Sequence, residues 1–190
     1  MRTYLDYTDD ELIQEILKGK QELFKILVLR YEQRVAATVI GMLGRCPEAE
    51  DIGQETFVRF YQSIDRFRGE SSLGTYLTRI AINLSINELK RRKRRWWLPF
   101  WGTKEKKESS PTRQIADDAD VYQQSEHREL IDKALANLDE KLRSVAVLRL
   151  IEGYSTKETA DLLQIPLGTV LSRLSRAQEQ MKKIIQQIAK

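Results

Sequence analysis

The sequence predicts an all-α protein in which two small helical domains are joined by a flexible linker. Its 190 residues include only four prolines and nine glycines, whereas leucine, lysine, glutamate and glutamine, which favour helices, are plentiful. Apolar residues recur three or four positions apart along most of the chain. The longest stretch without that spacing runs from Trp96 to Ser125. We therefore expect a first domain over residues 1–95, a linker over 96–125 and a second domain over 126–190.

The first domain begins with a capping signal. Thr8 and Glu11 match the pattern in which a hydroxyl and a carboxylate three residues apart satisfy free amides at a helix start. This pair predicts a short helix that ends near Leu17. Apolar residues at i, i+4 steps then predict a long helix over 21–43.

Two more helices complete the first domain. The third is expected over 47–64, with Pro47 in its first turn, where a missing N–H costs little. A loop over 66–72 contains a glycine and two serines. The fourth helix is expected to start at Leu73 and to continue into a run of basic residues.

Composition excludes several classes of protein. Cys46 is the single cysteine, so no internal disulfide can form, and we expect an inert small residue in a reducing compartment. His127 is the single histidine, which argues against a histidine-based triad or a metal site shared with Cys46. No phosphate-binding or dinucleotide glycine motif occurs. No signal peptide is apparent, and the apolar run over 35–43 is too short to span a bilayer. The expectation is a cytoplasmic protein without catalytic residues, metal or cofactor.

Positive charge is concentrated in one segment. Residues 79–113 carry a net charge of +8, although the whole chain carries only +4. The centre of this segment is the run KRRKRR over 90–95. Such a block can contact phosphates, with an affinity that falls steeply as salt rises. The alternative is a solvated helix end, where cations are also favourable.

The third helix has a polar face with an acidic and amide character. Asp51, Gln54, Glu55 and Val58 project away from its apolar side. Such a face could simply be solvated, and the residues alone favour that interpretation. It could also dock a basic partner helix, because complementary charge sets orientation and encounter rate.

The fourth helix carries a polar stripe made of Arg79, Asn83, Asn87 and Lys90. Asparagine is a poor helix former, so two in one stripe need an explanation. Asparagine amides can bind base edges, and arginine and lysine can bind phosphates. Nearby aromatic side chains could stack on single-stranded bases. The alternative is that the asparagines are buried and bonded to carbonyls.

The second domain is expected to hold four helices, with apolar faces over 130–138 and 142–151. Its last two helices form a helix-turn-helix. Ser155 and Glu158 make a second capping box, and Pro166 and Gly168 mark the turn. The following helix should bury Val170, Leu174, Ala177 and Met181 and expose Leu171, Ser172, Ser175 and Arg176. Such a helix suits the major groove of DNA, although any helical hairpin could show this pattern.

These segments together resemble a known family. Residues 51–95, DIGQETFVRFYQSIDRFRGESSLGTYLTRIAINLSINELKRRKRR, resemble region 2 of small sigma-70-type factors. Residues 152–181, EGYSTKETADLLQIPLGTVLSRLSRAQEQM, resemble their region 4. The order of the two segments is similar to that of the extracytoplasmic-function (ECF) group. The resemblance implies a bacterial subunit that binds core RNA polymerase, through its β and β′ subunits, and recognises promoter DNA in duplex and single-stranded form.

The resemblance also implies roles for particular residues. Those expected on the polymerase are Asp51, Gln54, Glu55 and Val58. Those expected on the minus-10 element, with a flipped base, are Phe67, Arg68, Ser72, Tyr76, Arg79, Asn83, Asn87, Lys90 and Arg91. Those expected on the minus-35 element are Thr169, Leu171, Ser172, Arg173, Ser175 and Arg176. Leu171 departs from the family, in which a cation is common, and could touch a thymine methyl.

Three points stay open at this level. An anti-sigma factor that covers the polymerase face is expected from family habit alone. The aromatic run WWLPFW over 96–101 could pack on the first domain or dock on a partner. A stand-alone helix-turn-helix regulator would explain the second domain, but it would leave the asparagine stripe and the acidic face of the first domain unexplained.

Overall fold

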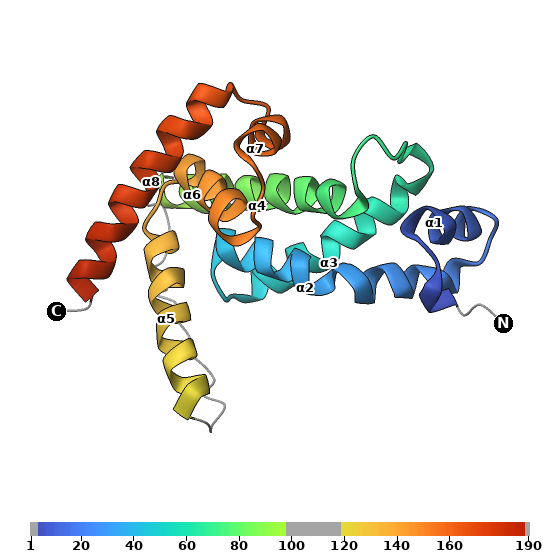
Figure 1. The fold of residues 1–190 in the computed structure, drawn as a ribbon, viewed down its shortest axis with the longest axis horizontal. Helices are drawn as coiled ribbons and strands as arrows, with labels where there is room; N and C mark the ends of the chain where they lie inside the picture. The colour runs from blue at the N-terminus through green and yellow to red at the C-terminus, as the bar shows by residue number, and fades with distance from the viewer. Residues whose placement is uncertain (1–3, 98–118, 189–190) are drawn as a thin grey trace.

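The structure of the chain is a computed structural model that describes residues 4–97 and 119–188 (Figure 1). All regular secondary structure in these residues is helical, which confirms the all-α prediction. Residues 98–118 of the predicted linker, and with them most of the WWLPFW run, lie outside the described residues. No helix in the described part is both long and apolar enough to cross a membrane.

The first helical unit follows the predicted order closely. Its elements are η1 (Tyr4–Asp6), α1 (Asp9–Leu17), η2 (Gln21–Leu23), α2 (Phe24–Leu43), α3 (Pro47–Gln62), η3 (Ile64–Arg66) and α4 (Leu73–Trp97). The predicted helix over 21–43 begins with a short 3₁₀ turn, and the one predicted over 47–64 ends at Gln62, before a 3₁₀ turn over Ile64–Arg66. Helix α4 runs through the whole basic block.

The second helical unit contains the predicted helix-turn-helix. Its elements are α5 (Ala119–Ala136), α6 (Glu140–Ala146), η4 (Val147–Ile151), α7 (Thr156–Leu163) and α8 (Leu167–Ile188). Helix α5 begins at Ala119 rather than at Glu126, and α4 includes Trp96 and Trp97. Helical backbone therefore extends into both ends of the stretch in which the apolar spacing is lost.

Capping residues fix the helix starts. The Thr8 hydroxyl accepts from the Glu11 amide at 3.2 Å, and the Glu11 carboxylate accepts from the Thr8 amide at 2.7 Å. Ser155 and Glu158 repeat the arrangement at α7. Both predicted capping boxes are confirmed. The hydrogen bonds from the Ser155 hydroxyl and amide hold the pKa of Glu158 below its usual range.

Phe60 lies at the centre of the first core and is fully buried. Its ring is 6.0 Å from that of Phe24, 6.1 Å from that of Phe67 and 5.9 Å from that of Tyr76, measured between centroids. Edge-on and offset ring pairs of this kind are favourable beyond their buried area. The core thereby positions the loop that precedes α4.

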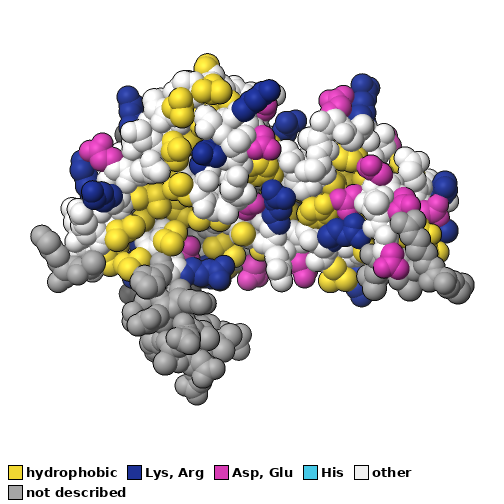
Figure 2. All heavy atoms as spheres, in the orientation of Figure 1, with side chains coloured by type: hydrophobic (Ala, Val, Ile, Leu, Met, Phe, Trp, Pro, Cys, Tyr) yellow, Lys and Arg dark blue, Asp and Glu magenta, His cyan; other side chains and the backbone are white. Residues whose placement is uncertain are grey.

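The second unit differs from the prediction at η4, which is a π-helix rather than a continuation of α6. Leu148 is buried there as expected, whereas Ile151, expected in the core, is 42% exposed. The wider turn of a π-helix rotates the residues that follow it away from a 3.6-residue spacing. Leu150 and Ile131 are also exposed, and Figure 2 shows hydrophobic side chains gathered where α5, α6 and α8 meet.

The two units pack against each other. Helices α5 and α6 and the π-helix η4 contact α2, and α6 also contacts α4 (Figure 1). Buried Arg143 donates from Nη1 to the Met42 carbonyl at 2.7 Å, close to the end of α2. A cation is favourable at the carboxyl end of a helix. The sequence contains no local signal for this contact.

Candidate nucleic-acid interface

Helix α4 presents the polar stripe to solvent. Asn83, Asn87 and Lys90 are exposed, and Arg79 is half-buried. The other side of α4 is buried and faces the core through Leu77, Thr78, Ala81, Ile82 and Ser85. The alternative in which both asparagines are buried is therefore wrong. Two exposed amides spaced one helical turn apart can donate to and accept from base edges.

A small pocket opens beside the start of this stripe. It has a volume of about 260 Å³ and is lined by Arg66, Phe67, Arg68, Gly69, Glu70, Ser71, Tyr76 and Arg79. The rings of Phe67 and Tyr76 stand edge to face at 5.2 Å. The Arg79 Nε is buried and meets no acceptor among the described residues. A pocket that combines an unpaired buried donor with aromatic rings is suited to a polar ring ligand such as a base.

Ser72 fixes the boundary between this loop and α4. Its hydroxyl accepts from the Thr75 amide at 3.2 Å and lies 2.9 Å from the Thr75 hydroxyl. It therefore works as a helix cap in this structure. Arg68 is exposed at the rim of the pocket.

The basic block is partly paired. Glu88, which is 8% exposed, accepts from Arg91 Nε at 2.7 Å and Arg91 Nη2 at 3.0 Å, and from Arg92 Nε at 3.1 Å. Arg92 also contacts Glu48 at 3.3 Å. The hydrogen bond from Arg91, reinforced by Arg92, holds the pKa of Glu88 below its usual range. Arg91, expected on DNA, is thus engaged with a carboxylate of its own helix.

Helix α3 presents the acidic and amide face as predicted. Asp51, Gln54 and Val58 are exposed, and Val58 retains 47% of its surface. Glu55 is half-buried and forms an ion pair with Arg59 at 2.7 Å. This face therefore combines the apolar side chain of Val58 with the hydrogen-bond acceptors of the acidic and amide side chains.

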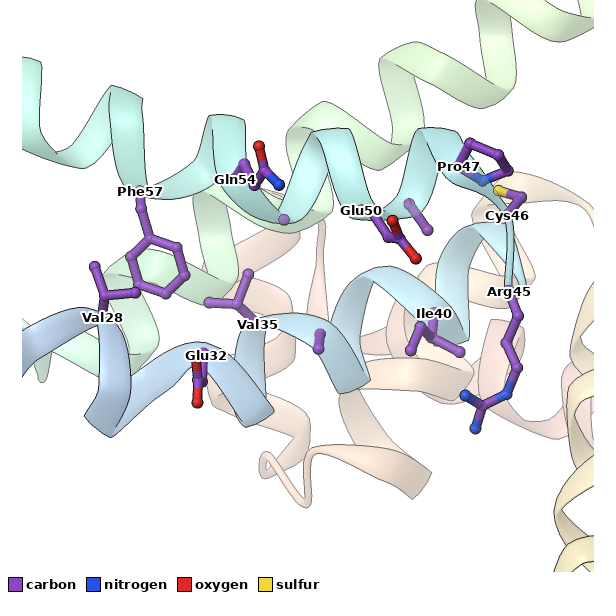
Figure 3. A pocket seen from close by; sticks show the side chains of 13 residues that line it. Val28, Glu32, Val35, Ile40, Arg45, Cys46, Pro47, Glu50, Gln54 and Phe57 are labelled. Carbon is purple, nitrogen blue, oxygen red and sulfur yellow. The ribbon is translucent and has the colours of Figure 1, made fainter. Parts of the chain in front are cut away.

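An apolar groove adjoins that face, between α2 and α3 (Figure 3). Its volume is about 660 Å³, and Val28, Val35, Ile40 and Phe57 line its floor and walls. Gln54 belongs both to this groove and to the polar face of α3. The two features therefore form one continuous surface.

Helix α8 exposes the predicted recognition residues. Leu171, Ser172, Ser175 and Arg176 are exposed, and Thr169 and Arg173 are half-buried. Val170 and Ala177 are fully buried against the rest of the second unit. The Ser172 hydroxyl donates to the Thr169 carbonyl at 3.1 Å. The exposed strip has the small, polar and cationic side chains that the major groove accepts.

Comparison with known proteins identifies both units. The family model for sigma-70 region 2 matches residues 27–95, and the one for sigma-70 region 4 matches residues 128–181. The RNA polymerase sigma-H factor of Pseudomonas aeruginosa is 32% identical over 94% of both chains. The chain belongs to the ECF group of the sigma-70 family. The ECF RNA polymerase sigma-E factors of Haemophilus influenzae and Escherichia coli are 32% and 31% identical over 94% of this chain and 96% and 95% of theirs.

Two solved structures have a similar fold. CnrH in complex with the cytosolic domain of CnrY has a TM-score of 0.63 and 23% identity, over 92% of this chain and 95% of that one. RpoE of Bartonella quintana in complex with the anti-sigma factor NepR has the same score and identity, over 86% and 96%. The fold resemblance thus extends over most of both chains.

The candidate sites of this ECF sigma-70 chain fall within its two matched regions. Region 2 contains the polar stripe, the aromatic pocket and the acidic face, and region 4 contains the helix-turn-helix. In the part of the chain that the structure describes, no three histidine, cysteine or acidic side chains gather as metal ligands. The half-buried Cys46 accepts from Arg92 Nη2 at 3.1 Å.

Sequence reasoning missed the polar residues between the two regions. Glu152 accepts from the Thr38 hydroxyl at 2.8 Å and from Arg34 Nε at 3.2 Å. Arg34 Nη2 also donates to the Tyr154 hydroxyl at 2.9 Å. The partners are separated by more than 100 positions. Only covariation of these positions among homologues could have indicated the contacts from sequence.

Proposed function

We propose that this chain is an ECF sigma factor that joins core RNA polymerase, recognises the minus-35 and minus-10 elements of a promoter and promotes DNA opening. The single observation that carries the proposal is the exposure of Asn83 and Asn87 on α4, beside a pocket that combines aromatic rings with an unpaired guanidinium nitrogen. Amides read bases and the pocket suits one unstacked base.

In this proposal region 2 acts on single-stranded DNA. The pocket would receive a flipped base beside Phe67, Tyr76 and Arg79, with Ser72 holding the loop in place. Lys90, with Arg68 at the rim, would bind phosphates. Arg91 would contribute mainly by holding Glu88, since its guanidinium is already bidentate to that carboxylate.

Region 4 would read duplex DNA with the exposed strip of α8. Ser172, Ser175 and Arg176 can donate to acceptors on base edges, whereas Leu171 can pack on a thymine methyl. Thr169 and Arg173 lie at the margin of the strip, where they can contact backbone phosphates.

Removal of the Arg176 guanidinium should weaken recognition of the minus-35 element. We expect Arg176→Ala to reduce binding of the matched element by about 1–3 kcal/mol, because one good base contact has this value. Gel-shift titration of polymerase complexes on matched and scrambled minus-35 elements measures the change. Lys182→Ala, an exposed cation further along α8, is the matched control. Unchanged preference for the matched element would contradict this assignment.

The partner of the α3 face is proposed to be core polymerase. Asp51, Gln54 and Glu55 supply acceptors and Val58 an apolar contact for a basic helical segment, and complementary charge would orient the encounter. The adjoining groove has the size and apolar lining for a second helical ligand. Since the Bartonella quintana relative is captured with an anti-sigma factor, we propose such a protein as the regulator of this surface.

Transcription with purified components tests the proposed function. Core enzyme, this chain and a promoter library from the source genome should give run-off transcripts that core enzyme alone does not give. A stand-alone helix-turn-helix regulator would instead shift promoter DNA unaided and leave core enzyme inactive. In the proposed role the polymerase performs the chemistry, so the chain needs no catalytic residue.

A further inference from the structure

The surface between regions 2 and 4 is closely fitted. The Glu152 side chain is 5% exposed, and Tyr154 as a whole residue is also 5% exposed. The Arg34 guanidinium lies 5.2 Å from the centre of the Tyr154 ring, and the Tyr154 hydroxyl donates to Thr78 at 3.2 Å. These polar groups have one another as partners only while the two regions are in contact, because separation would expose them to water instead.

Gly41, inside α2, permits the close approach, and Gly74, in the first turn of α4, leaves room for Arg34. A Cβ on Gly41 in α2 would lie 3.0 Å from a methyl of Val147 in η4. A Cβ on Gly74 in α4 would lie 2.8 Å from the Arg34 guanidinium. Neither glycine has a positive φ angle, so backbone conformation does not require them. Glycine in a helix interior costs about 1 kcal/mol relative to alanine. Gly41 is thus explained by the packing of η4 against α2, and Gly74 leaves space for the flexible end of the Arg34 side chain.

The closed arrangement conflicts with simultaneous reading of both promoter elements. The minus-35 and minus-10 elements are, by their names, about 25 base pairs apart, or ~85 Å at the rise of B-form DNA. Compact units of roughly 95 and 70 residues have radii of gyration of ~12 and ~11 Å, so two such units in contact span at most about 60 Å. Regions 2 and 4 must therefore separate to occupy both elements.

We propose that the contact between regions 2 and 4 is an autoinhibitory lock that holds the free protein closed. The lock consists of Glu152 and Tyr154 on Arg34, Thr38 and Thr78, of Arg143 on the Met42 carbonyl, and of Val147 on Gly41. Binding to core polymerase, which favours the separated arrangement, opens it. This inference rests on the proposed function, because it assumes that both elements are read.

A reversible cross-link tests the lock. A Cβ on Gly41 would lie 3.8 Å from the Cβ of Val147, which is the mean Cβ separation in disulfides, about 3.8 Å. The variant Gly41→Cys with Val147→Cys, in a Cys46→Ser background, should therefore oxidise readily in the free protein. The matched control is Gly53→Cys with Val147→Cys, because a Cβ on Gly53 meets nothing within 4 Å.

The oxidised cross-linked protein should initiate at least about tenfold less than its reduced form on a promoter with both elements, since a tenfold change is a typical size for coupling between two states. Reductant should restore initiation. Equal activity of the two forms, or failure of the cysteines to pair, would overturn the lock. Inactivity of the reduced form and of the unmodified chain would instead count against the proposed function.

A measurement on the unmodified chain is independent of the cysteine variants. Small-angle scattering of the free protein should fit the closed arrangement, and Glu152→Gln should shift the profile toward separated units because Arg34 and Thr38 lose a charged acceptor. A separated profile for the unmodified chain would refute the lock even where the cysteine variants do not fold.

Discussion

Replacement of Asn83 and Asn87 by alanine should abolish promoter opening and leave binding to core polymerase intact. Both amides are exposed on α4, far from any role in the core. Each base contact of this kind is worth about 1–3 kcal/mol, so the pair should cost about 2–6 kcal/mol of opening free energy. Alanine favours helix more than asparagine does, so lost opening cannot be ascribed to a weakened helix.

Permanganate reactivity of unpaired thymines measures opening, and native electrophoresis with core enzyme measures association. Gln14→Ala with Gln33→Ala removes two exposed amides from α1 and α2 and is the matched control. If the double asparagine variant no longer bound core polymerase, the assignment of the stripe to DNA would be wrong.

The second large effect concerns stability. Phe60→Ala should reduce the free energy of unfolding by about 3–5 kcal/mol, the range for truncation of a buried phenylalanine. Phe60 is completely buried and its ring contacts three other aromatic rings. Chemical denaturation followed by circular dichroism measures the loss.

The same substitution should also impair the aromatic pocket, because Phe67 and Tyr76 both rest on Phe60. Tyr61→Ala is the matched control, since Tyr61 is 37% exposed and its ring stands edge to face with that of Phe24. A Phe60→Ala protein as stable as the Tyr61→Ala protein would place the core of region 2 elsewhere.

Local patterns account for most of the fold. Capping boxes at Thr8 and Ser155 mark helix starts because their hydrogen bonds join residues three apart. The apolar spacing on α8 correctly assigned Val170 and Ala177 to the core and Arg176 to solvent. Such signals depend on neighbours along the chain and are therefore visible in one sequence.

Features that depend on distant residues were missed or wrong. The exposure of Ile151 follows from the π-helix, which no 3.6-residue pattern anticipates. The contact of Glu152 with Arg34 joins two regions, and the apolar periodicity of each region carries no information about its packing on the other. Of the candidate sites, the exposed faces could be predicted from periodicity, whereas the contact of Arg92 in α4 with Glu48 in α3 joins residues 44 positions apart and could not.

The pairing of Glu88 changes what the run KRRKRR can contribute to salt-dependent binding. A cation makes DNA affinity more salt-dependent only if it reaches a phosphate and displaces a condensed counterion. Each phosphate neutralised on duplex DNA releases about 0.9 counterion. Arg91 and Arg92 already share a buried carboxylate of the protein. The block therefore has fewer counterions to displace than its six cations suggest, and its hold on DNA is correspondingly less sensitive to the ionic strength of the cell.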